Sequence, residues 1–268
     1  MVDRMKQNPN ARDRQTAESG ENPLIVGRNA VLEALRAGRE LDTIYLCDTD
    51  AAFSGKLRAL ARDAGCVVKA ATRQKLDAMT GGLNHQGVAA AEACAPYVEV
   101  EDLLAVAEQR GRPPFLVVAD EIEDPHNLGA IIRTAEAVGA DGLILPKRRS
   151  ASLNATVHKT SAGAASVLKV ARVANLAACL RELKKKNIWV YGADMDGTAW
   201  NELDYRGGVA LVIGSEGRGL SRVVKEECDF VASLPMAGQI NSLNASVAAG
   251  VLLYEAARQR GHFDGGQK

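Results

Sequence analysis

The sequence has no excess of charge of either sign and no long apolar run. Its 268 residues contain 33 Lys and Arg and 33 Asp and Glu. Because no overall positive field results, a histone-like nucleic-acid binder is excluded, although an enzyme that binds RNA through a local patch is not. No apolar stretch approaches the length of a membrane span, and the N-terminus lacks the order of a signal peptide. We therefore expect a cytoplasmic protein that does not enter a membrane.

Cysteine and histidine are few and scattered. The five cysteines are an odd number without a C-x-x-C pair, which indicates small buried side chains in a reducing compartment. The four histidines lack the spacing of metal ligands. We expect no metal site, and any cofactor is expected to be organic.

Composition divides the chain into four parts. Residues 1–22 are polar with almost no apolar anchor and are expected to be disordered. Residues 23–95 alternate short helices and strands, which predicts a compact α/β domain. Residues 96–112, a charged helix followed by Gly and Pro, are expected to connect it to a second α/β domain at 113–268. In that domain the alternation of strands and helices predicts a mostly parallel sheet with helices on both faces.

Three loops of unusual composition follow expected strands of the second domain. Ligands of such sheets bind beyond the carboxyl ends of the strands. The first loop leads from Asp120 into a helix on which Arg133 faces away from the apolar stripe. Gly129, one turn earlier, is expected to leave room for a bulky group beside the guanidinium. Periodicity alone favours a solvated surface arginine at position 133, and the alternative interpretation of Asn127 is a helix N-cap and no more.

The second loop, Ile213 to Ser221, is rich in glycine but matches no common nucleotide or nucleophile motif. Its glycines follow the pattern G-x-x-G-x-G, so the dinucleotide fingerprint, the P-loop and the nucleophile elbow all fail. The carboxylate of Glu216 would repel an anion. A cationic ligand therefore suits this loop better than a phosphate.

The third loop, Leu234 to Leu243, precedes a long C-terminal helix. Pro235 and Gly238 allow its backbone to fold around a ligand, and Ser242 is the expected N-cap of the helix. An apolar face is expected to pack into a core or against a partner subunit; it comprises Leu243, Val247, Ala248, Val251, Leu252 and Tyr254.

These three segments together resemble the motifs of the SpoU family of SPOUT methyltransferases. D-P-x-N-x-G-x-x-x-R stands at Asp124 to Arg133, G-x-E-x-x-G at Gly214 to Gly219, and L-P-M-x-G…S-L-N-x-S at Leu234 to Ser246. The first domain resembles the substrate-binding domain of that family in Gly27-Arg28-Asn29-Ala30 and in R-x-x-L-D…H-Q-G-V from Arg73 to Val88.

The resemblance implies an enzyme that methylates the ribose 2'-oxygen of a guanosine in the 23S RNA of the large ribosomal subunit. It implies S-adenosylmethionine as the cofactor, a homodimer that includes the C-terminal helix, and an RNA-binding first domain with the fold of certain ribosomal proteins. It also implies a trefoil knot in the second domain, which general topology rules would have argued against.

Motif position assigns roles to eight residues. The resemblance implies that the cofactor is held by Gly214, Leu234, Met236 and Leu243. It implies that the ribose and the transferred methyl are served by Arg133, Asn127, Glu216 and Asn244. Since a guanidinium is effectively always protonated, we interpret Arg133 as an electrostatic clamp and not as a base. The base is left open between Glu216 and a phosphate of the RNA.

Two other functions remain open. One is a ribose methyltransferase of the same family that acts on transfer RNA, although the family's enzymes for the D-loop generally lack the first domain. The other is an RNA-binding ribosome-assembly factor without catalysis. The joint presence of Arg133, Asn127, Glu216 and Asn244 disfavours the second.

Overall fold

The computed structural model describes residues 24–47, 50–239 and 241–263. The chain divides into two compact units, one that comprises the residues up to Cys94 together with 154–156, and one that comprises 95–153 and 157 onward. The tail at 1–22, predicted to be disordered, lies outside the described residues. Among the described helices, none combines the length and apolar character that crossing a membrane requires.

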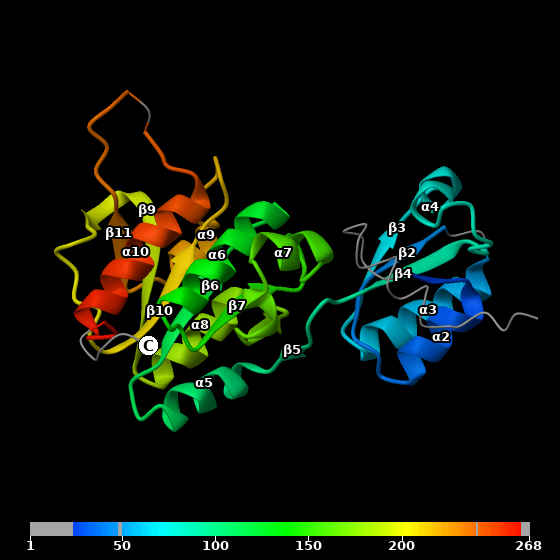
Figure 1. The fold of residues 1–268 in the computed structure, drawn as a ribbon, viewed down its shortest axis with the longest axis horizontal. Coiled ribbons are helices and arrows are strands. Elements are labelled where there is room, and N and C mark those ends of the chain that lie inside the picture. The colour runs from blue at the N-terminus through cyan, green and yellow to red at the C-terminus, as the bar shows by residue number, and fades with distance from the viewer. Residues whose placement is uncertain (1–23, 48–49, 240, 264–268) are drawn as a thin grey trace, which may run out of the picture. The chain divides into compact units, whose positions relative to one another are not determined.

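The first unit contains a four-stranded mixed sheet (Figure 1). Its strands are β1 (Leu24–Val26), β2 (Leu41–Leu46), β3 (Val67–Ala70) and β4 (Val88–Glu92). The spatial order is β1-β4-β2-β3, with β4 antiparallel to both neighbours and β2 parallel to β3. The predicted α/β character is confirmed, although β1 was not predicted.

Three helices complete the first unit, namely α2 (Arg28–Arg36), α3 (Ala51–Asp63) and α4 (Arg73–Met79). Val31 of α2 and Leu57 of α3 bury their side chains fully against Ile44 of β2. Asp50 and Thr72 cap α3 and α4, each by accepting a hydrogen bond from a backbone N–H of the first turn. The apolar stripes therefore dock two helices on the sheet, and polar caps fix where the helices begin.

The second unit contains a seven-stranded sheet in which every described pairing is parallel. Its strands are β5 (Tyr97–Val98), β6 (Phe115–Ala119), β7 (Gly142–Pro146), β8 (Val170–Val173), β9 (Ile188–Ala199), β10 (Gly208–Ile213) and β11 (Phe230–Ser233). The order is β11-β9-β10-β6-β7-β8-β5. The predicted mostly parallel sheet is confirmed, and the trefoil knot stays a prediction.

Helices cover both faces of this sheet (Figure 1). They are α5 (Val100–Gln109), α6 (Pro125–Ala137), α7 (Ala155–Thr160), α8 (Leu176–Lys185), α9 (Arg222–Lys225) and α10 (Ala245–Gln259), with a 3-10 turn η1 (Ala164–Ser166). Val117 of β6 packs toward α6 and α10, whereas the next residue, Val118, packs toward α5 and α8. Successive side chains of a strand face opposite sides, so β6 contributes to both layers and is buried throughout.

The segment 96–112, predicted to connect the two domains, lies within the second unit by its contacts. Tyr97 of β5 pairs with Val170 of β8. Leu103 of α5 is fully buried against Gly142, where an added Cβ would lie 2.4 Å from a Leu103 methyl carbon. The charged exposed face of α5 dominated the composition and concealed this single buried stripe.

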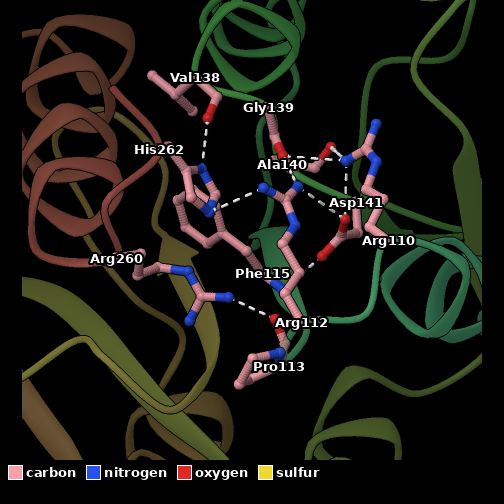
Figure 2. A network of polar contacts seen from close by, with 10 residues as sticks. All are labelled: Arg110, Arg112, Pro113, Phe115, Val138, Gly139, Ala140, Asp141, Arg260 and His262. Carbon is pink, nitrogen blue, oxygen red and sulfur yellow. Dashed lines mark hydrogen bonds and ion pairs between the residues drawn. The ribbon is translucent and has the colours of Figure 1, made fainter. Parts of the chain in front are cut away.

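A buried carboxylate ties the amino ends of the central strands to the C-terminus, as Figure 2 shows. Asp141 Oδ2 accepts from the backbone N–H of Phe115 at 2.8 Å, and Oδ1 accepts from Arg110 at 2.8 Å and Arg112 at 3.1 Å. Arg112 also donates to Nε2 of His262 at 2.9 Å. The Asp141 side chain is completely buried, so both arginines compensate a charge that water cannot reach.

His262 joins this network as a neutral ring. Its Nδ1 lies 2.9 Å from the carbonyl oxygen of Val138, which can only accept, so Nδ1 carries the proton and Nε2 accepts from Arg112. Burial, with the nearby Arg112, lowers the pKa of His262. The chain beyond α10 is therefore anchored to the loop that follows α6 (Figure 2).

We predict that Asp141→Ala lowers the free energy of unfolding by about 3–5 kcal/mol, because Arg110, Arg112 and the buried N–H of Phe115 lose their acceptor. Asp204→Ala is the matched control, since the Asp204 side chain is mostly exposed and pairs with Arg206 at 2.7 Å; it is expected to cost about 1 kcal/mol or less. Urea denaturation measures both. Equal losses would show that the Asp141 network does not hold the fold.

Candidate active site

A pocket of about 350 Å³ opens at the carboxyl ends of adjacent strands. The sheet order β11-β9-β10-β6 places the ends of these four strands side by side. The pocket is lined by the middle of β9, the end of β10 and the loop after it, β11 and the loop after it, and α10. Its lining residues are Ala193, Asp194, Met195, Ile213, Gly214, Ser215, Glu216, Gly217, Arg218, Gly219, Ala232, Leu234, Met236, Asn241, Ser242, Leu243, Ala245, Ala248 and Leu252. The two later loops singled out from sequence therefore meet in one cavity.

The glycine-rich loop after β10 is a tight backbone turn. The N–H of Ser215 donates to the carbonyl of Gly219 at 3.0 Å, and the N–H of Gly219 donates back at 2.9 Å. A Cβ on Gly214 would lie 2.3 Å from the carbonyl carbon of Gly219, and Gly217 has a φ of +81°. Because these positions exclude a side chain, the loop presents its backbone and the Glu216 side chain to the pocket.

A buried carboxylate at the end of β6 holds the far end of that loop. Asp120 Oδ2 accepts from the backbone N–H of Ser221 at 2.6 Å. Burial raises the pKa of Asp120, and the hydrogen bonds from Ser221 oppose that rise. Asp120 thereby fixes the loop between β10 and α9 to the neighbouring strand.

Every residue predicted to hold the cofactor lies in the pocket wall: Gly214, Leu234, Met236 and Leu243. Met236 and Leu243 are both 38% exposed, as expected for side chains that line a cavity instead of filling a core. Their role in cofactor binding stays a prediction.

Three of the predicted catalytic residues form a closed hydrogen-bonded triangle. Asn244 Nδ2 donates to Asn127 Oδ1 at 2.9 Å and to Glu216 Oε2 at 3.4 Å. Asn127 Nδ2 donates to the same Glu216 oxygen at 3.3 Å. Glu216 also lines the pocket, so the triangle joins the pocket to the start of α6.

The N-caps of α6 and α10 explain why the side-chain amides of Asn127 and Asn244 are available for the triangle. Asp124, not Asn127, caps α6, since its side chain accepts from the N–H of His126. Asn244, not Ser242, caps α10: its Oδ1 accepts from the N–H groups of Ser246 and Val247. The cap uses only the oxygen of Asn244, so its Nδ2 is free to complete the triangle.

Arg133, the fourth predicted catalytic residue, makes no described hydrogen bond with the triangle. It is exposed on α6, which confirms that it faces away from the core. Among the described residues, no hydrogen bond or ion pair involves its side chain. Gly129 does not leave the expected space, because a Cβ there would lie 2.7 Å from Thr160 Cβ and 3.0 Å from the carbonyl of Val157. That glycine lets α7 pack closely on α6.

One wall of the pocket was not predicted. Ala193, Asp194 and Met195 line it from β9, and Asp194 pairs with Lys225 at 2.9 Å. The signal was available, since Asp194 ends an expected strand that proves to be the direct neighbour of β10, but the strand order was not readable from sequence. Within the part of the chain that the structure describes, no group of His, Cys, Asp and Glu is arranged to hold a metal ion.

Both units match known families. Residues 114–254 match the family model described as SpoU rRNA Methylase family. Residues 24–97 match the model described as RNA 2'-O ribose methyltransferase substrate binding. The chain belongs to the SpoU rRNA Methylase family and is an RNA methyltransferase, as the sequence motifs predicted.

The alignments with two curated relatives cover almost the full length of each relative. The chain is 46% identical over 244 residues to the Putative TrmH family tRNA/rRNA methyltransferase YacO of Bacillus subtilis (strain 168), across 90% of this chain and 98% of that protein. It is 45% identical over 247 residues to the 23S rRNA (guanosine-2'-O-)-methyltransferase RlmB of Xylella fastidiosa (strain 9a5c), with the same two shares.

A solved structure shares the fold. The SpoU methyltransferase AviRb from Streptomyces viridochromogenes, crystallised in complex with the cofactor AdoMet, aligns with a TM-score of 0.57 and 27% identity. The alignment covers 95% of this chain and 94% of that one.

We predict that Asn244→Ala lowers the free energy of unfolding by about 1 kcal/mol through loss of the cap and lowers methyl transfer by about 100-fold through loss of the triangle. Asn175→Ala is the matched control, because Asn175 caps α8 in the same way, by accepting from Ala178 N–H. Urea denaturation and transfer of labelled methyl to an RNA transcript measure the two effects. If Asn175→Ala lowers transfer equally, the loss reflects stability alone.

Proposed function

We propose that the chain transfers a methyl group from S-adenosylmethionine to the 2'-oxygen of a guanosine ribose in 23S ribosomal RNA. The observation that carries this proposal is the triangle of Asn127, Glu216 and Asn244 at a pocket of ligand size. The 45% identity to a 23S rRNA (guanosine-2'-O-)-methyltransferase supports the substrate.

The pocket suits the proposed cofactor in size and chemistry. Its volume of about 350 Å³ lies within the usual range of small-molecule sites, roughly 300–1,000 Å³. Leu234, Met236 and Leu243 offer apolar surface, while Glu216 and Asp194 offer carboxylates to a cation. S-adenosylmethionine, when bound there, would supply an electrophilic methyl on a sulfonium.

The protein's own contribution is position and charge. The triangle fixes the Glu216 side chain between two amides, so its carboxylate is held in one place before RNA arrives. Arg133, exposed and without a described partner, is available to hold a phosphate or the developing negative charge on the 2'-oxygen.

Two groups can take the proton of the 2'-hydroxyl. One is Glu216, whose Oε1 takes part in no contact among the described residues. The other is a phosphate of the RNA next to the reacting ribose. Arg133 is not a candidate, because a guanidinium keeps its proton under all ordinary conditions.

Transfer RNA is the second candidate substrate. The relative from Bacillus subtilis is named as a tRNA/rRNA methyltransferase, so its name does not separate the two RNAs. A ribosome-assembly factor without catalysis is disfavoured, because Asn127, Glu216 and Asn244 form the triangle instead of standing apart.

We predict that cells lacking this protein lose one 2'-O-methylguanosine of 23S RNA, and that the wild-type chain restores it while Arg133→Ala does not. Transfer by the purified Arg133→Ala variant is expected to fall at least about 100-fold. Its affinity for S-adenosylmethionine should stay within a few-fold, because the side chain does not line the pocket. Mapping of 2'-O-methyl sites and isothermal titration measure these effects.

Arg222→Ala is the control for that experiment, since Arg222 is an exposed arginine of the same unit whose one ion pair among the described residues is with Glu226, four residues on. It is expected to restore the modification fully. Restoration by Arg133→Ala would refute the role of Arg133, and loss of a transfer-RNA methyl group in place of the ribosomal one would favour the second substrate.

We propose in addition that the chain forms a homodimer through α10. The apolar face expected on this helix is divided in the structure: Leu252 is fully buried, whereas Val247 and Tyr254 are 52% and 51% exposed. Tyr254 also stacks on Phe263 with ring centroids 5.7 Å apart. A second copy would cover this exposed apolar strip.

We predict that the double variant Val247→Lys with Tyr254→Lys sediments as a monomer, since two charges cannot be buried in an apolar interface. Val167→Lys is the control, because Val167 is 70% exposed and lies outside α10; it should sediment like the wild type. Sedimentation velocity decides the matter, and an unchanged dimer of the double variant would place the interface elsewhere.

We propose the cytoplasm as the compartment. The structure joins none of the five cysteines in a disulfide, and ribosomal RNA is found in that compartment. Burial raises the pKa of the Cys179 thiol to about 11 and that of Cys228 to about 12, so neither thiol is activated for redox chemistry.

A further inference from the structure

A second cavity lies entirely within the first unit, in the domain whose motifs the pocket described above does not use. It has a volume of about 420 Å³ and is lined by Arg28, Cys47, Arg73, His85, Gln86 and Gly87. Arg28 belongs to the Gly-Arg-Asn-Ala motif, and the remaining residues except Cys47 belong to the motif from Arg73 to Val88. Two motifs separated by some forty residues of sequence therefore meet at one hollow.

The fold brings these motifs together at one end of the small sheet. Arg28 follows β1, Cys47 follows β2, and Gly87 directly precedes β4, which runs antiparallel to both. Cys47 N–H donates to the carbonyl of Gly87 at 2.8 Å, and Gly27 N–H donates to the carbonyl of Val88 at 3.1 Å. The floor of the cavity is thus fixed by backbone hydrogen bonds.

The wall at 85–87 is held in an uncommon backbone conformation. Gln86 has a φ of +50° and Gly87 a φ of +83°. The backbone of a residue other than glycine rarely adopts a positive φ. Arg28 Nε donates to the carbonyl of Gln86 at 3.1 Å, and Gln86 Oε1 accepts from Arg28 N–H at 3.2 Å. Strained backbone held in place by its surroundings is concentrated at functional sites.

His85 supports this wall and offers nothing to a ligand. It is only 4% exposed. Its Nδ1 accepts from Gly87 N–H at 2.9 Å, so its Nε2 carries the proton and donates to Asp77 at 3.0 Å. Both ring nitrogens are therefore occupied.

The side-chain groups that remain free in the cavity are almost all hydrogen-bond donors. Arg28 uses Nε and Nη1 in its contacts with Gln86 and Asp50, and no contact among the described residues uses its Nη2. Arg73 is exposed and makes no described polar contact. Gln86 has committed its oxygen to Arg28, which leaves its Nε2. The lining thus offers two cations and an amide donor and has no carboxylate.

We propose that this cavity binds a backbone phosphate of the substrate RNA, with Arg28, Arg73 and the Nε2 of Gln86 as donors. A phosphodiester is an anion that only accepts hydrogen bonds, which matches the free donors of this lining, although Arg28 also pairs with Asp50 at 2.7 Å. The cavity begins at the N-terminal end of α2, which carries no acidic residue in its first turn, so the helix dipole adds to the positive potential. This inference rests on the proposed action on RNA.

The test compares Arg73→Ala and Gln86→Glu in the full chain. Neither side chain holds the fold: Arg73 makes no described contact, and the carboxylate of Gln86→Glu keeps an acceptor for Arg28 N–H while it replaces the free donor by a charge. Arg36→Ala is the matched control, because Arg36 is exposed at the opposite end of α2, about 12 Å from Arg28 by helical rise.

Binding of a 23S RNA transcript is measured across a salt series. We expect Arg73→Ala to weaken binding about fivefold near physiological salt and to reduce the slope of log affinity against log salt by about one. Gln86→Glu should weaken binding at least as much. Arg36→Ala should match the wild type, and the affinity for S-adenosylmethionine should not change in any variant.

If Arg73→Ala and Gln86→Glu bind RNA as tightly as Arg36→Ala and the wild type, and the wild type binds and methylates the transcript normally, the site is wrong and the proposed function stands. Failure of the wild type to bind or methylate the transcript would overturn the proposed function itself.

Discussion

The side-chain amide of Asn244 is the contact on which the geometry of the proposed active site depends. Its oxygen caps α10, and its nitrogen donates to Asn127 and Glu216, which are 117 and 28 residues away in the sequence. One planar group thereby fixes the start of a helix, the direction of a carboxylate and the first turn of α6. Because the two atoms of the amide have different partners, neither aspartate nor alanine can replace it without loss of one function.

The parallel sheet makes this contact possible. Strands β6, β10, β9 and β11 are neighbours in the sheet, so the loops after β10 and β11 and the middle of β9 meet at one pocket although other elements separate them along the chain. Asp120 and the glycine-rich turn then hold the loop after β10 close to β6. At the amino ends of the strands, Asp141 and Arg112 anchor the segment that follows α10 through His262. The amino ends of the strands are thus held by buried contacts, and the loops that line the pocket lie at the other end of the sheet.

The two cavities differ in their linings, as the proposed binding of a cofactor in one and of RNA in the other requires. The pocket in the second unit has apolar walls and carboxylates, which suit a cationic cofactor. The cavity in the first unit has two arginines and a free amide donor, which suit an anion. These opposite linings explain why a chain with no net charge can act on RNA: recognition requires only local charge, held where the fold places it.

The sequence by itself determined the elements with strong periodicity, the parallel sheet, and the loops that meet at the pocket, because apolar spacing and glycine placement act locally. Motif resemblance added the family. The tertiary structure alone decided that residues 96–112 belong to the second unit, since one buried leucine outweighs a charged surface that composition emphasises. It also decided that Asn244 and Asp124 cap their helices, and that Gly129 serves packing with α7. Capping and close approach depend on backbone direction and on neighbours distant in sequence, and neither is written in the local pattern of residues.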